Sequence, residues 1–257
     1  CESMDLRKNA LMISTEIGDW ADLLSNRDNV LFPNLLCSYA LRKGASLLQS
    51  LRPEDAARFA KRATQVTEAI RDLFWVKEPG SFSDETHFKV RTLMSTLLRN
   101  RPYFLPWVSQ CDWGEHFDTT GNLLAILTDV ADESQSSAIL NYIEQVGVNR
   151  PYPVQVLYPA IQPGDKEWRE YMKMFNLNLP NQYHNGGIWP WVGGLYVASL
   201  VKSGLLEKAE AELLRLAESL RLGKEEWECN EWLHGKSGVP MGYKYQAWSA
   251  GMFLYAR

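Results

Sequence analysis

The stretch NVLFPNLLCSYALRKGASLLQSL, residues 29–51, decides the fold class of this 257-residue chain. Its apolar side chains recur three or four positions apart and so line one face of a helix: Leu31, Leu35, Leu36, Tyr39, Ala40, Leu47 and Leu48. After Pro53, residues 54–75 repeat the same spacing. Because the loop between the two segments is short, together they predict a helical hairpin.

Helical spacing continues along the rest of the chain. Further helices are predicted at residues 122–130, 134–146, 188–201, 205–222 and 245–255, and Gly204 is a stop signal between two of them. Strands are expected only at residues 88–90 and 154–158, without βαβ alternation. No solenoid repeat is visible, so we expect the hairpins to close around a common axis. The predicted fold class is all-α.

Composition limits the class of partner. The formal charge is −4 and 46% of the residues are hydrophobic, so we expect one compact domain over residues 1–257 and neither nucleic acid nor a membrane as partner. Four cysteines without a CxxC pair, and no signal peptide, favour a cytoplasmic protein. Because the first residue is Cys1 rather than Met, we expect the C-terminal portion of a longer domain.

A polar and aromatic run, NQYHNGGIWPW at residues 181–191, carries the functional signal. It combines groups that bind hydroxyls with two indoles and a Gly-Gly pair: Gln182, Tyr183, His184, Asn185, Trp189 and Trp191. Several adjacent polar groups that lack partners inside the protein are typical of an open cleft that binds a ligand. Indole faces stack on sugar rings. The alternative is a glycine turn followed by a helix whose tryptophans belong to the core.

Two carboxylate motifs lie near opposite ends of the chain: GDWAD at residues 18–22 and NEWLHGKSG at residues 230–238. Taken singly, the first fits the N-terminal region of a helix, and the second fits a polar turn. Together with an aromatic cleft, they match glycoside hydrolysis, which uses two carboxyl groups on opposite sides of the bond that breaks.

The run at residues 181–191 resembles the QYHNGGxWP signature of neutral/alkaline invertases and of bacterial proteins similar to amylo-α-1,6-glucosidases and processing α-glucosidases. The stretches FDTTGNLLAILTDVAD (117–132), PYPVQVLYPAIQPGD (151–165) and YKYQAWSAGMFLYA (243–256) are similar to the same group. The resemblance implies an (α/α)6 toroid of twelve helices. This sequence predicts fewer helices, so we expect that the N-terminal hairpins are lacking or that a partner chain supplies them.

The resemblance also implies the catalytic pair. The family's Trp-x-Asp element matches Trp20–Asp22 and makes Asp22 the candidate general acid, with Asp19 as the alternative. The family's second carboxylate, seven positions before a glycine, matches Glu231, with Glu228 as the alternative. The chain departs from the family pattern at Asn230 and at Trp232–Leu233, which affects substrate choice.

The predicted function is an inverting glycoside hydrolase that acts on a short α-linked glucoside or a sucrose-like disaccharide. Inversion implies a carboxyl separation of roughly 6.5–9.5 Å. No cofactor or metal is expected, because the four histidines lack metal-ligand spacing. The predicted substrate-binding residues are Asp19, Trp20, Gln182, Tyr183, His184, Asn185, Gly187, Trp189, Trp191, Gln246 and Trp248. The alternatives are a sugar isomerase similar to N-acylglucosamine epimerase and a catalytically silent carbohydrate-binding fragment.

Overall fold

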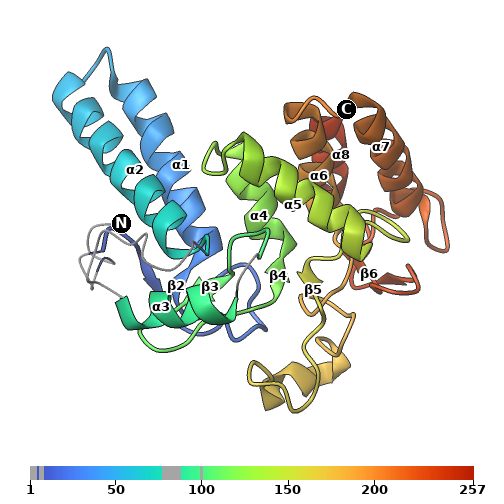
Figure 1. The fold of residues 1–257 in the computed structure, drawn as a ribbon. Helices are drawn as coiled ribbons and strands as arrows, with labels where there is room; N and C mark the ends of the chain where they lie inside the picture. The colour runs from blue at the N-terminus through green and yellow to red at the C-terminus, as the bar shows by residue number, and fades with distance from the viewer. Residues whose placement is uncertain (1–4, 6–8, 77–87, 99–100) are drawn as a thin grey trace.

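Helices make up most of the regular secondary structure in this computed structural model, which describes residues 5, 9–76, 88–98 and 101–257 (Figure 1). The α-helices, in chain order, are α1 (Leu31–Leu48), α2 (Pro53–Leu73), α3 (Phe88–Leu97), α4 (Thr119–Leu127), α5 (Glu133–Val146), α6 (Pro190–Lys202), α7 (Leu206–Arg221) and α8 (Ala247–Ala256). A 3-10 segment spans Glu170–Asn176. None of the described helices is long and apolar enough to cross a membrane.

Local signals explain where the helices begin and end. Pro53 occupies the first position of α2, where its missing N–H costs no hydrogen bond. At α5, Asp132 and Gln135 form a capping box, in which each side chain accepts a hydrogen bond from the other residue's backbone N–H. Gly147 ends α5 in the left-handed conformation (φ 72°), which glycine adopts without strain.

The helices are arranged as an inner and an outer set. Helices α1, α4, α6 and α8 each contact the next in that order, while α2, α5 and α7 pack against α1, α4 and α6 from outside. The inner helices α4 and α6 are buried along most of their length, because both neighbours and an outer helix cover them. This arrangement of α/α hairpins, drawn in Figure 1, is consistent with an α/α toroid.

Short antiparallel strands lie where the chain enters the inner helices. They are β1 (Ile13–Ser14), β2 (Asp28–Val30) and β3 (Trp107–Val108); β4 (Phe117–Asp118) and β5 (Leu157–Tyr158); and β6 (Trp232–Leu233) and β7 (Pro240–Met241). Backbone hydrogen bonds tie the first residue of two inner helices to this layer: Leu31 to Pro106 and Thr119 to Val156. The loops before α1, α4, α6 and α8 are therefore held at one end of the arc.

The predicted all-α class and the helices expected from periodicity are confirmed, with boundaries shifted by a few residues. The prediction of a strand at residues 88–90 is wrong, because these residues begin α3. Val90, Met94 and Leu98 are buried and recur every fourth position, which is the spacing of a helix face. Of the strand expected at residues 154–158, Leu157–Tyr158 pairs with β4, and Gln155 forms an isolated antiparallel bridge with Ile188.

Candidate active site

The loop before β2 presents the GDWAD motif, and its two aspartates differ in their surroundings. Asp19 accepts hydrogen bonds from the Ala21 backbone N–H (2.9 Å) and from the Asn26 side chain (3.2 Å), so its carboxylate holds the loop together. Burial raises the pKa of Asp19, although both hydrogen bonds oppose that rise. The Asp22 side chain is 61% exposed, and partial burial raises its pKa. Of the two, Asp22 is the more exposed and has no loop hydrogen bond comparable to those of Asp19 among the described contacts.

Trp20 joins this loop to the run at residues 181–191. Its ring centroid lies 4.7 Å from that of His184, 5.6 Å from that of Trp189 and 5.1 Å from that of Trp191, each in an edge-to-face arrangement. Such contacts between aromatic rings stabilise beyond the apolar area they bury. The tertiary structure therefore places Asp22, two residues after Trp20, beside the central motif.

His184 lies at the centre of this cluster and is 2% exposed. Its ring stacks on Trp189, and Nδ1 lies 3.4 Å from the Asp22 Oδ1 atom without meeting hydrogen-bond geometry. Burial lowers the pKa of His184 to about 3, so the imidazole is neutral at pH 7. A charged histidine would favour the ionised form of Asp22, whereas this neutral imidazole does not.

Tyr183 links the two predicted carboxylates. Burial raises its pKa to about 12, and the negative charges of Asp22 and Glu231 contribute to the rise, so both carboxylates lie within electrostatic reach of this phenol. The Tyr183 backbone has φ 41°, a conformation that costs a bulky residue free energy. Its ring centroid lies 5.9 Å from that of Trp232, the residue that follows Glu231. The Tyr183 ring thus packs beside the second carboxylate motif.

Glu231 and Glu228 have different environments. The Glu231 Oε2 atom accepts a hydrogen bond from the Tyr243 backbone N–H (3.1 Å), and the carboxylate lies beside Gly242. Glu228 is buried and accepts hydrogen bonds from the backbone N–H groups of Lys224 (3.0 Å) and Glu225 (3.1 Å). The Glu228 carboxylate is thus used to close its own loop.

Several predicted hydroxyl-binding groups are engaged inside the protein. Asn185 is fully buried: its Oδ1 accepts from the Ile161 N–H (2.7 Å) and its Nδ2 donates to the Ile161 carbonyl (2.9 Å). Trp189 is 4% exposed and donates from Nε1 to the Tyr183 carbonyl (3.0 Å). A Cβ atom at Gly187 would lie 2.5 Å from the same carbonyl, so protein backbone occupies that space. These three residues shape the loop.

Other predicted binding residues remain available to a ligand. Trp191 and Gln246 are partly exposed, and Trp248 is 50% exposed on α8. The Gln182 Oε1 atom is buried and has no hydrogen-bond partner within the described residues. Trp191, Gln246 and Trp248 are thus open to solvent at least in part, whereas the Gln182 Oε1 atom is not.

Residues 87–257 match the family model described as alkaline and neutral invertase, which is two thirds of the chain. The chain belongs to the alkaline and neutral invertase family. Its similarity to probable alkaline/neutral invertase D of Arabidopsis thaliana is 35% identity over 163 residues, which cover 60% of this chain and 29% of the relative. Cytosolic invertase 1 of Oryza sativa subsp. japonica is 34% identical, with 60% and 27% covered. The matched part thus spans less than a third of these relatives.

Solved structures share the fold of this invertase-family chain. The GH63 mannosylglycerate hydrolase from Thermus thermophilus superposes with a TM-score of 0.62 at 13% identity, over 89% of this chain and 46% of that one. A rhamnosidase from Klebsiella oxytoca gives a TM-score of 0.56 at 14% identity, over 97% and 38%. The family match includes Tyr183 and Glu231, whereas Asp22 lies before it; the case for Asp22 therefore rests on its place in the structure.

Sequence reasoning missed Asp118, a fully buried carboxyl group immediately before α4. Burial raises its pKa to about 7, the charge of Asp19 adds to the rise, and the backbone N–H groups of Gly121 and Thr120 oppose it. Its position before a helix beginning with Thr119 is a helix N-terminus signal, but nothing in the sequence indicates that the residue faces Asp19. No group of three or more metal-binding side chains is present in the described ranges.

Proposed function

We propose that this chain carries the active site of an inverting glycoside hydrolase that cleaves a sucrose-like disaccharide or a short α-linked glucoside. The observation that carries the proposal is that the charges of Asp22 and Glu231 both act on the Tyr183 phenol, next to the aromatic rings that contact Trp20. Two carboxyl groups beside aromatic surfaces are what hydrolysis of a glycosidic bond requires.

The environments of the two carboxyl groups support separate roles. Asp22 has a raised pKa and a neutral imidazole beside it, which suits a general acid that donates its proton to the departing glycosidic oxygen. Glu231 accepts a hydrogen bond from the Tyr243 N–H, an arrangement that suits an ionised carboxylate acting as a general base on water. Attack by water on the face opposite the leaving group inverts the anomeric carbon.

The choice of substrate rests on the relatives. Those reported above are named as invertases, and the structural neighbour is a mannosylglycerate hydrolase. We therefore place sucrose first and mannosylglycerate among the other candidates. A cytoplasmic location is part of the proposal, supported by the relative named as cytosolic, although other relatives are named as mitochondrial or chloroplastic.

We also propose that further helices, from the same polypeptide or a partner chain, complete the ring between α8 and α1. Helix α8 has no charged residue, yet Trp248, Leu254 and Tyr255 are 50%, 68% and 67% exposed. Such a patch is typical of a surface that another element covers. In this proposal residues 1–257 form part of one catalytic domain.

A catalytically silent sugar-binding protein is the second candidate, favoured by this open end of the arc. The epimerase-like alternative lacks support, since His184 is neutral and almost fully buried.

The deciding experiment measures the release of reducing sugar from sucrose, trehalose, maltose, isomaltose, glucosylglycerate and mannosylglycerate. Asp22→Asn and Glu231→Gln should each lower kcat by about 10²–10⁴-fold, because each removes one proton-transfer group. Asp19→Asn and Glu228→Gln are the matched controls, which should reduce stability more than chemistry. Proton NMR of the first product from an α-glucoside should show β-glucose.

Three outcomes would contradict parts of the proposal. If Glu228→Gln loses as much activity as Glu231→Gln, the base is wrongly assigned. If α-glucose appears first, the reaction retains configuration. If no sugar is cleaved but sugars bind equally to all variants, the silent binder is the better description.

A further inference from the structure

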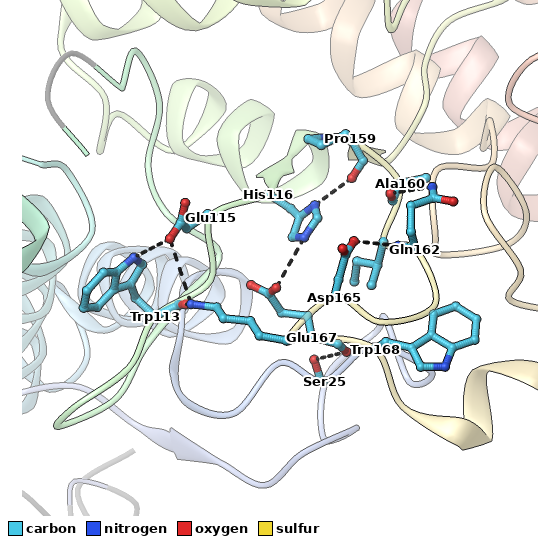
Figure 2. A network of polar contacts seen from close by, with 12 residues as sticks. Ser25, Trp113, Glu115, His116, Pro159, Ala160, Gln162, Asp165, Glu167 and Trp168 are labelled. Atoms are coloured by element: carbon cyan, nitrogen blue, oxygen red, sulfur yellow. Dashed lines mark hydrogen bonds and ion pairs between the residues drawn. The ribbon is translucent and has the colours of Figure 1, made fainter. Parts of the chain in front are cut away.

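A buried histidine and glutamate lie near Ser25, three residues after Asp22, and outside the site described above (Figure 2). The side chains of His116 and Glu167 are 12% and 6% exposed, and the His116 Nε2 atom lies 3.5 Å from the Glu167 Oε2 atom. On the other side of the ring, the Nδ1 atom lies 2.6 Å from the Pro159 carbonyl oxygen. The pair therefore joins the strand before α4 to the segment that follows β5.

The geometry fixes where the protons are. A carbonyl oxygen only accepts, so Nδ1 of His116 must carry the hydrogen that is donated to Pro159. A neutral imidazole with that tautomer would present a bare Nε2 lone pair to the Glu167 carboxylate, which is unfavourable in a buried place. One additional proton on Nε2 removes the conflict, because an imidazolium then faces the Oε2 atom of a carboxylate whose Oε1 atom has no hydrogen-bond partner within the described residues.

The charged groups around the pair favour this state. Burial alone lowers the pKa of His116, but Glu167, the Pro159 carbonyl and Asp165 outweigh it, so that the pKa is raised above its usual value. Burial raises the pKa of Glu167, but His116, Lys166 and the Glu115 backbone N–H outweigh it and hold it below its usual range.

The segment around Glu167 supports the Asp22 loop directly. The Ser25 hydroxyl donates to the Glu167 backbone carbonyl (2.9 Å), and both groups are buried. The Asn178 side chain donates to the Leu23 carbonyl (2.8 Å). Met172, which is fully buried, belongs to the same apolar cluster as Ala21, which precedes Asp22. A shift of the segment would thus move the residues on both sides of Asp22.

We propose that His116 and Glu167 are positioning residues that hold the Asp22 loop in place, and that loss of the proton between them loosens the loop at alkaline pH. The proposal rests on the proposed function for its catalytic consequence, but its structural part can be tested without turnover. When the His116 Nε2 proton is lost to solvent hydroxide, the Glu167 carboxylate remains buried without its cation, which destabilises the segment.

The direction of the pH effect follows from the raised pKa of His116. The pair contributes its full stabilisation at pH values below the pKa of a histidine in the unfolded chain, about 6.5. This stabilisation is lost as the pH rises through the higher pKa of His116 in the folded protein. We therefore expect an alkaline limb in kcat that follows the titration of His116, with a smaller effect on KM. The groups that face the pair, and whose charges must be considered, are Asp165 and Lys166.

Glu167→Gln is the decisive variant. A glutamine amide can donate to the neutral Nε2 atom of His116, so the pair no longer needs the extra proton. NMR titration of the histidine side chains, with His116→Gln used for assignment, should place His116 above 6.5 in the original protein and at least about one pH unit lower in Glu167→Gln, a tenfold change in the proton equilibrium constant. The alkaline limb of kcat should move with it.

Hydrogen exchange of residues 18–26, corrected for the intrinsic pH dependence, gives the readout that does not need activity. Protection should fall as His116 deprotonates in the original protein and should be independent of this titration in Glu167→Gln and His116→Gln. Glu212→Gln is the control. It alters a buried carboxylate on α7 that pairs with Arg150 and Arg215, and it should keep the original pH dependence.

The proposal is overturned if His116 titrates below 6.5 in the original protein, or if protection of residues 18–26 does not change as His116 deprotonates. It is also overturned if the limb of kcat stays fixed when Glu167→Gln moves the titration. Absence of turnover on every sugar would contradict the proposed function alone, since the NMR and exchange measurements would still decide whether the pair positions the loop.

Discussion

Gly242→Ala tests whether the position of the Glu231 carboxylate controls the reaction. A Cβ atom at Gly242 would lie 2.5 Å from the Glu231 Oε2 atom and 2.7 Å from two atoms of the Trp232 ring. Ordinary van der Waals contact begins near 3.4 Å, so the carboxylate has to move by about 0.9 Å. Because Trp232 is buried and the Glu231 side chain is flexible, we expect the carboxylate to move.

The expected magnitudes follow from this displacement. A misplacement of about 1 Å in a reacting group costs about 100-fold in rate, so kcat of Gly242→Ala should fall by about 100-fold. Gly242 also has φ 70°, so an alanine there costs about 1 kcal/mol of stability, and crowding of Trp232 adds about 1–3 kcal/mol. The assay combines initial rates on the best substrate with urea denaturation.

Gly204→Ala is the matched control. Gly204 has φ 74° and a Cβ atom there would have no neighbour within 4 Å, so it introduces the same backbone strain without touching the site. Its stability should fall by about 1 kcal/mol with kcat unchanged. The double variant Gly242→Ala/Glu231→Gln should be no slower than Glu231→Gln alone, because both changes act through one group. A kcat for Gly242→Ala equal to that of Gly204→Ala would refute the reasoning.

Three other changes test separate parts of the structure. Tyr183→Phe removes the phenol on which the charges of both carboxylates act and should lower kcat by about tenfold or more with the fold retained, as measured by rates and near-ultraviolet circular dichroism; unchanged kinetics would exclude a role for the hydroxyl. Asp132→Ala removes the capping box of α5 and should cost about 1 kcal/mol at pH 7 in urea denaturation. Because hydrogen bonds from Gln135 and Ser134 lower the pKa of Asp132, this difference should persist above pH 4 and disappear as the pH falls through the folded value; a difference that persists at pH 2 would contradict the assignment. Leu35→Ala, at a fully buried position of α1, should cost about 2–5 kcal/mol of unfolding free energy, and a loss below 1 kcal/mol would mean that the α1–α4 contact does not form part of the core.

Periodicity predicted most of the fold because the apolar residues that a helix buries recur three or four positions apart in the sequence. The spacing of apolar residues in α1, α2 and α7 marks the buried face, and Pro53 and Gly147 mark where helices start and stop. The strand predicted at residues 88–90 missed α3, although Val90, Met94 and Leu98 carry the four-residue spacing of a helix face.

The candidate site was only partly predictable. The run at residues 181–191 and the two carboxylate motifs are visible as unusual mixtures of polar and aromatic residues, and in the structure the run contacts Trp20 of the first motif and Trp232 of the second. The sequence did not show which polar side chains lack a hydrogen bond within the protein. Hydrogen bonds between side chains and loop backbone do not recur at a regular spacing along the chain. Asn185 and Glu228 look like ligand-binding groups in the sequence, yet their donors and acceptors are satisfied by their own loops.

The sequence by itself determined the helical class, the family and the segments from which a site can be built, since these depend on local spacing and on short motifs. Only the tertiary structure decided that Asp22 is more exposed than Asp19, that His184 is neutral, and that His116 faces Glu167. These properties depend on burial and on contacts between distant segments, and the charge state of a buried group is set by the neighbours that the fold places around it.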